Sequence, residues 1–168
     1  NLHNIHQPNY SIFYIFLQIF NQIYLIRKKI IFIMNKVNNM KKIVLCGSMK
    51  VKDKILEIKE RLEAKGYTVL LPVECMEGLP KEIASRAHFK RIEDKNNEIV
   101  LIVNATKNGI KNYIGPNSFA EIAFAFYFKK EIYLLNDYYA PYLDELLGWH
   151  VIPLKGNLDK INDKVTQK

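Results

Sequence analysis

Cysteine is scarce in this chain of 168 residues, where only Cys46 and Cys75 occur. Two thiols are too few for the disulfide framework of a small secreted domain, and they are typical of reduced core thiols in a cytoplasmic protein. The cysteines and histidines also lack the close spacing along the sequence that zinc motifs have. We therefore expect a cytoplasmic protein with no metal ion and no cofactor.

Glycine-rich phosphate motifs are also missing. The sequence has neither the G-x-G-x-x-G of dinucleotide-binding folds nor the G-x-x-x-x-G-K-[ST] of P-loops. It has instead one Gly47-Ser48-Met49 turn, directly after an apolar run. A glycine at this point lets backbone N–H groups face a ligand oxyanion, whereas a plain turn between a strand and a helix is the simpler interpretation.

Residues 1–39 contain no acidic residue, no glycine and no alanine. Their apolar run Ile12–Ile26 is interrupted by three amide side chains, so it falls short of the roughly 20 apolar residues of a membrane span. A signal anchor, an amphipathic surface helix and translated upstream sequence, with the start at Met34 or Met40, are the competing interpretations. The abrupt change of composition favours the third, so we expect an extension at 1–39 and one folded domain at 40–168.

The chain has no dense basic patch. Its net charge is +8, and residues 1–39 supply half of it through four basic residues. In the remainder the lysines are scattered among glutamates, whereas a nucleic-acid groove needs clustered cations with interleaved aromatics. A hydrophobic content of 49% and a charged content of 25% indicate a globular domain. We expect a small-molecule ligand, with neither a nucleic acid polymer nor a membrane as partner.

From residue 40 onward, short apolar runs alternate with segments whose apolar residues have helical spacing. The runs predict strands at Ile43–Cys46, Tyr67–Leu71, Ile99–Val103, Ile132–Leu135 and Val151–Leu154. The other segments predict helices at Val51–Lys65, Lys81–Asn96, Ser118–Lys129 and Asn157–Val165. This alternation predicts an α/β fold: a doubly wound parallel five-stranded sheet in the flavodoxin-like order 2-1-3-4-5, with helices on both faces.

In such sheets, ligands bind at the carboxyl ends of the strands, at the switch point between the first and the third strand. Gly47–Met49 and Asn104–Thr106 follow those two strands, and Cys46 ends the first of them. The helix that contains Glu121 should begin beside them. We therefore expect these segments to converge on one cleft.

Glu121 has two interpretations. Ser118-Phe-Ala-Glu121 has the spacing of a capping box, with Ser118 at the N-cap and Glu121 at N3. In the functional interpretation, Glu121 points into the cleft, where the helix N-terminus favours its ionised form and the carboxylate acts as a nucleophile. The two interpretations are compatible, because Ser118 can cap the helix while Glu121 turns towards the cleft.

The neighbouring polar residues are weaker candidates. His88 lies on the second predicted helix and Glu98 begins the third strand, and either could serve as an acid or base. Asn104 and Asn117 are amides in cleft loops that can bond a sugar or a base, although turn chemistry explains a single Asn equally well. Tyr113 is either a lid aromatic or part of the loop packing.

Several of these stretches together carry a family resemblance. They are Ile43-Val-Leu-Cys-Gly-Ser-Met49, His88, Glu98-Ile-Val-Leu-Ile-Val-Asn104, Asn112-Tyr-Ile-Gly-Pro-Asn-Ser-Phe-Ala-Glu-Ile-Ala-Phe-Ala125 and Lys130-Glu-Ile-Tyr-Leu-Leu135. Residues from about 40 to 160 resemble the nucleoside 2-deoxyribosyltransferase-like superfamily, which includes the 2′-deoxynucleoside 5′-phosphate N-hydrolases. The Tyr-Ile-Gly-x-Asn-Ser-x-x-Glu stretch is the most specific part of the match.

The resemblance implies that Glu121 attacks C1′ of a 2-deoxyribosyl group and displaces the base, and that a second base or water then resolves the glycosyl-enzyme ester. It also implies a homodimer or a higher homo-oligomer. With the cleft argument, it leads us to expect substrate contacts from Cys46, Gly47, Ser48, Met49, Asn104, Tyr113, Gly115, Asn117 and Ser118.

The chain departs from the family in two places. Glu98 stands where the family usually has Asp, and Gly115-Pro116-Asn117 fills the stretch where the transferases carry an Asp shortly before the nucleophile. His88 or Glu98 is then the expected partner acid.

Two classes of function stay open. The first is an enzyme that cleaves or transfers at the N-glycosidic bond of a 2′-deoxynucleoside or its 5′-monophosphate. The second is a non-catalytic nucleotide-binding or sensing module on the same fold, in which Glu121 only caps the helix. A related enzyme interpretation is the cytokinin-type phosphoribohydrolase family. Its motif has two consecutive glycines and a Gly-Thr before the glutamate, and the stretch Ile114-Gly-Pro-Asn117 lacks both.

Overall fold

The structure is a computed structural model that describes residues 10–38, 40–72 and 78–162. The chain forms two compact units, Asn1–Met40 and Lys41–Lys168. Cys75 and residues 163–165 of the predicted closing helix lie outside the described residues.

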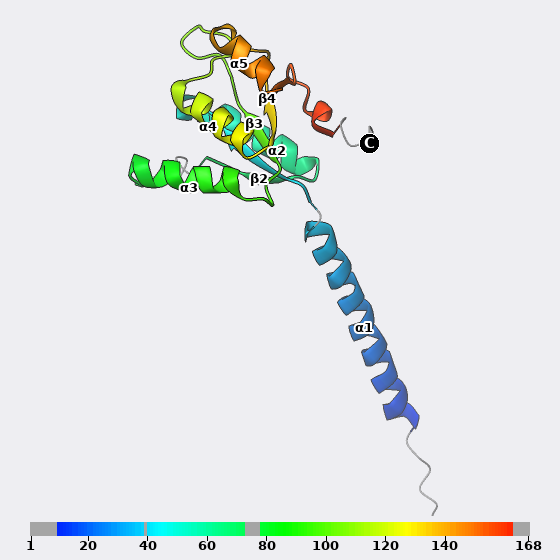
Figure 1. Ribbon diagram of the computed structural model, residues 1–168. Helices are drawn as coiled ribbons and strands as arrows, with labels where there is room; N and C mark the ends of the chain where they lie inside the picture. Colours follow the sequence, from blue (N-terminus) through cyan, green and yellow to red (C-terminus); the bar gives the residue numbers. More distant parts are fainter. Residues whose placement is uncertain (1–9, 39, 73–77, 163–168) are drawn as a thin grey trace, which may run out of the picture. The chain divides into compact units, whose positions relative to one another are not determined.

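The first unit contains one helix, α1 (Tyr10–Asn38), of 29 residues (Figure 1). The side chains from Tyr14 to Met34 are all exposed, the apolar ones included. None of the helices in the described ranges combines the length and the apolarity that crossing a bilayer requires.

The second unit contains a five-stranded sheet in which every neighbouring pair of strands is parallel. The strands are β1 (Lys42–Cys46), β2 (Thr68–Leu70), β3 (Ile99–Ile102), β4 (Glu131–Leu134) and β5 (Ile152–Pro153). Their order is β2-β1-β3-β4-β5. Cys46 pairs with Ile102, and Ile102 with Leu134, so the carboxyl ends of the central strands align at one edge. The predicted parallel sheet in the order 2-1-3-4-5 is therefore confirmed.

The helices of this unit are α2 Lys52–Ala64, α3 Lys81–Glu93, α4 Pro116–Tyr127 and α5 Leu143–Gly148. Alternating side chains of the strands build a core on each face of the sheet. On one face, Ile43 and Leu45 of β1 pack in a cluster with Ile58 of α2. On the other face, Val44 packs in a second cluster with residues of α3, α4 and α5, among them Ile122. Helices on both faces confirm the doubly wound arrangement (Figure 1).

The structure differs from the predicted helices at α3, at α5 and at the closing helix, and it also starts α4 earlier than predicted. α3 ends at Glu93 and not at Asn96, because the Asp94 carboxylate accepts a hydrogen bond from the backbone N–H of Asn96 and forms a turn there. The helix α5 was not predicted, since its six residues are too few to show a helical period. The closing helix is a 3-10 helix, Leu158–Asn162, within the described residues.

Candidate functional site

A pocket of about 400 Å³ lies at the carboxyl edge of the sheet, between the turn after β1 and the start of α4. Seven of the residues predicted from the sequence line it: Gly47, Ser48, Met49, Gly115, Asn117, Ser118 and Glu121. The other lining residues are Lys81, Lys107 and Pro116. The topology therefore brings together two segments that are far apart in the sequence, at the position where parallel sheets bind ligands.

Glu121 lies in the second turn of α4, because this helix begins earlier than the capping box predicts. Gly115 is the N-cap, Pro116 occupies the first helical turn, and no side chain caps the helix. Proline suits this position because the backbone N–H groups of the first helical turn have no partner within the helix, so a residue without an N–H loses no hydrogen bond there. The prediction that Ser118 is the N-cap and Glu121 is at N3 is therefore wrong. Glu121 therefore has no role in a capping box, and most of the expected effect of the helix dipole is lost as well, because that effect fades beyond the first turn.

The carboxylate of Glu121 is buried against two other side chains but still lines the pocket. Its residue is 7% exposed, and its Oε1 lies 3.5 Å from Nε2 of His88, which is 1% exposed. The same Nε2 lies 3.2 Å from Sγ of Cys46, whose side chain is fully buried. His88 therefore sits behind Glu121 and is not among the residues that line the pocket. Its Nε2 contacts the carboxylate of Glu121, and its expected role as an acid stays a prediction.

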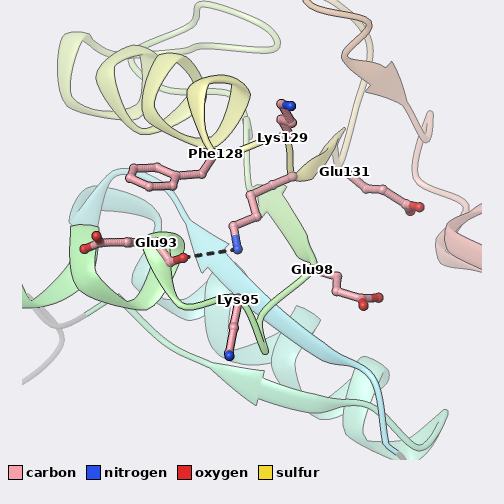
Figure 2. A pocket seen from close by; sticks show the side chains of 7 residues that line it. Glu93, Lys95, Glu98, Phe128, Lys129 and Glu131 are labelled. Atoms are coloured by element: carbon pink, nitrogen blue, oxygen red, sulfur yellow. Dashed lines mark hydrogen bonds between the residues drawn. The ribbon is translucent and has the colours of Figure 1, made fainter.

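Glu98 does not belong to this pocket. It precedes β3 at the amino edge of the sheet and lines a different hollow of about 420 Å³, together with Lys95 and Glu131 (Figure 2). Lys130 lines that hollow as well, and its ammonium group donates hydrogen bonds to the carbonyl oxygens of Glu93 and Asp94. Burial lowers the pKa of Lys130, and the carboxylates of Asp94 and Glu98 oppose that shift. The structure thus separates Glu98 from Glu121 by the length of the strand.

Asn104 and Tyr113 have structural contacts outside the pocket lining. The amide of Asn104 is fully buried and bonds the loop after β4, donating to the carbonyl of Asp137 and accepting from the N–H of Asn136. The ring of Tyr113 contacts the ring of Tyr139 edge-on, with 5.6 Å between the ring centroids. Nζ of Lys107 lies 4.6 Å from the centroid of the Tyr113 ring. Both residues shape the loops beside the pocket.

The sequence interpretation missed two lysines of the pocket. Lys81 begins α3 and Lys107 lies in the loop after β3. They are 26 positions apart in the sequence, so no local cluster of charge marks them as a pair. The parallel sheet places both segments at its carboxyl edge, and the pocket becomes cationic as a result. Among the described residues that line it, Glu121 is the only acid.

Gly47 is constrained by packing as well as by the pocket. A Cβ at this position would lie 3.3 Å from both the Ile55 side chain and the carbonyl oxygen of Val103. The three atoms nearest to a Cβ at Gly115 belong to the ring of Tyr113, the closest at 3.2 Å, whereas a Cβ at Gly148 would meet no heavy atom within 4 Å.

We expect Gly47→Ala to lower the free energy of unfolding by about 1–2 kcal/mol, because a carbonyl within the core cannot yield. Gly148→Ala is the matched control, because a Cβ there would meet no heavy atom within 4 Å, and its expected loss is below about 0.5 kcal/mol. Urea denaturation of the two variants measures the difference. An equal or larger loss for Gly148→Ala would contradict the packing account.

Comparison with known proteins assigns no function to these residues, since neither a protein-family model nor a curated protein matches the chain. The chemistry of the pocket is therefore judged from its own groups. It combines one buried carboxylate with two cations and a Gly-Ser turn. A carboxylate held in this way can attack an electron-poor carbon, while the cations can hold an anionic group of the same ligand.

Proposed function

We propose that the protein cleaves or transfers at the N-glycosidic bond of a 2′-deoxynucleoside or its 5′-monophosphate, with Glu121 as the nucleophile. One observation carries the proposal. Glu121 is a buried helical carboxylate that lines a pocket at the switch point of a parallel sheet, and its predicted role as a cap has been lost. The resemblance of Asn112–Glu121 to the deoxyribosyltransferase-like sequences supports the same assignment.

The reaction proceeds by two displacements at the same carbon. A carboxylate oxygen of Glu121 forms a bond to C1′ while the bond from C1′ to the base nitrogen breaks, and the electron pair leaves with the base, which takes up a proton from solvent. Water, or an N–H nitrogen of a second base, then attacks C1′, loses a proton to solvent and releases the carboxylate. His88 acts as a positioning residue for the carboxylate, through the 3.5 Å contact.

The two lysines favour the 5′-monophosphate as substrate. Lys81 and Lys107 line the pocket together with Ser48 of the turn after β1. A phosphate group can accept charge-assisted hydrogen bonds from ammonium groups, and each is worth about 1.5–3 kcal/mol. A nucleoside without the phosphate gains none of this binding energy.

The test is to incubate the full-length protein with deoxynucleosides and with their 5′-monophosphates, and to measure the free base by chromatography. We expect base release from both classes, with kcat/KM at least about tenfold higher for the monophosphates. Lys81→Met combined with Lys107→Met should remove that preference. Lys129→Met changes a lysine of the other hollow and is the matched control.

One outcome of this experiment contradicts the proposed enzyme. If no substrate releases a base while a monophosphate raises the melting temperature, the protein is a nucleotide-binding module and Glu121 has no chemical role. The homo-oligomeric state and the cytoplasmic location expected from the sequence stay predictions.

A further inference from the structure

The structure brings three potential metal ligands from three separate segments to one point. Cys46 ends β1, His88 lies on α3 and Glu121 lies on α4. One ligand atom from each, namely a thiol sulfur, an imidazole nitrogen and a carboxylate oxygen, lies within 4.8 Å of the other two. All three residues are buried, with exposed fractions of 0%, 1% and 7%. We propose that this cluster, the Cys46–His88–Glu121 site, binds one Zn²⁺ ion.

The separations between the atoms suit a tetrahedral ion. Zinc bonds of about 2.3 Å to sulfur and 2.0–2.2 Å to nitrogen and oxygen place neighbouring ligand atoms about 3.4–3.6 Å apart. The sulfur of Cys46 is 3.2 Å from Nε2 of His88, and Oε1 of Glu121 is 3.5 Å from that nitrogen. Movements of a few tenths of an ångström bring these two pairs to the tetrahedral separation. The third pair, the sulfur of Cys46 and the carboxylate oxygen of Glu121, lies within 4.8 Å and has to close to about 3.6 Å around the ion.

The chemistry of the three ligands selects the kind of metal. A thiolate and an imidazole bind borderline-soft ions such as Zn²⁺ and Co²⁺, whereas Mg²⁺ and Ca²⁺ require sets of oxygen ligands. The thiolate and the carboxylate each carry one negative charge and the imidazole is neutral, so together they compensate the charge of a buried divalent cation.

The pocket supplies an entry path and a fourth position. Glu121 belongs both to the cluster and to the pocket lining, so an ion can reach the cluster from the pocket side. Three protein ligands leave one tetrahedral position, which a water molecule from the pocket can fill. The bound ion engages the carboxylate of Glu121, so zinc binding and any nucleophilic role of Glu121 exclude each other.

The experiment uses the full-length protein, kept reduced with a phosphine, and Co²⁺ as an absorbing probe. We expect one Co²⁺ per chain, with a thiolate-to-cobalt band in the near ultraviolet and the visible bands of a tetrahedral ion, and we expect Zn²⁺ to displace it. Cys46→Ser should abolish the near-ultraviolet band. Cys75→Ser, the other cysteine of the chain, is the matched control and should keep it.

A second variant and a measurement without variants complete the test. His88→Gln keeps the thiol and should weaken Co²⁺ binding at least about tenfold. Loss of a group that only contacts a metal ligand already lowers metal affinity by about 10–100-fold, and His88 is a ligand itself in this proposal. X-ray absorption of the zinc-loaded wild type should report one sulfur and nitrogen or oxygen neighbours. An equal band in wild type and Cys46→Ser, or a zinc shell without sulfur, overturns the proposal.

These readouts do not depend on base release, so the two proposals can fail separately. Cobalt binding by a protein that cleaves no nucleotide leaves the metal site intact and removes the proposed enzyme. Base release without a thiolate-to-cobalt band removes the proposed metal site and leaves the proposed enzyme intact. Where both hold, added Zn²⁺ should inhibit base release and a chelator should restore it.

Discussion

If the proposed reaction takes place, Glu121→Gln should abolish base release, with an expected fall in kcat of at least about 10³-fold. The amide has the size of the carboxylate, but its oxygen carries no negative charge and is too weak a nucleophile to form the ester bond to C1′. Glutamine can still contact the ring nitrogen of His88, which is 3.5 Å from Oε1 in the wild type. The fold and the affinity for a 5′-monophosphate should therefore change little. Base release is measured by chromatography, and affinity by the shift in melting temperature with nucleotide.

The matched control for this experiment is Glu98→Gln. It makes the same chemical change at an exposed carboxylate that lines the hollow at the amino edge of the sheet, away from the pocket. Its kcat should stay within about twofold of the wild-type value. Equal activity of Glu121→Gln and the wild type would remove Glu121 from the mechanism. Loss of activity in Glu98→Gln alone would show that the sequence-based assignment of that residue was right and the geometric one wrong.

The sheet could be predicted from the sequence because its signals are local. The strands are short and mainly apolar, the central ones, β1, β3 and β4, are almost entirely buried, and segments with a helical period separate the strands. The parallel order then follows from the regular alternation, together with the rules for crossover connections. The helix α5 escaped prediction because six residues hold less than two turns.

The start of α4 was placed too late because two local signals compete there. Ser118-Phe-Ala-Glu121 has the spacing of a capping box, whereas Gly115-Pro116 favours an earlier start. The structure follows the proline. This shift of three residues moves the carboxylate of Glu121 out of the first turn and removes its predicted role in a capping box.

The site was predicted in part, and the missing parts are the long-range ones. The turn at Gly47 and the glutamate at 121 follow from position in a parallel sheet. The lysines at 81 and 107, and the contact of Cys46 with His88, depend on how loops and helices pack across the sheet. Sequence spacing carries no information about such contacts, which explains why the Cys46–His88–Glu121 site has no local motif in the sequence.

Asn104 provides the second large effect, and it concerns stability. Its side chain is fully buried and makes two hydrogen bonds to the loop after β4, from Nδ2 to the carbonyl of Asp137 at 2.8 Å and to Oδ1 from the N–H of Asn136 at 2.9 Å. Asn104→Ala removes both bonds and leaves those two backbone groups without them. Each loss costs about 1–2 kcal/mol, so the free energy of unfolding should fall by about 2–4 kcal/mol. Urea denaturation measures the change.

Asn97→Ala is the matched control, because Asn97 is the other buried asparagine among the described residues. Its Nδ2 donates one bond, to the carbonyl of Arg91 at 2.8 Å, and its Oδ1 has no hydrogen-bond partner in the described part of the chain. Alanine therefore removes one bond and also one poorly satisfied oxygen, so the loss should be about 1 kcal/mol or less. A stable Asn104→Ala variant with weaker nucleotide binding would instead identify Asn104 as a substrate ligand, as its position after β3 first indicates. The larger stability loss is expected because that amide is already committed to the loop at Asn136 and Asp137.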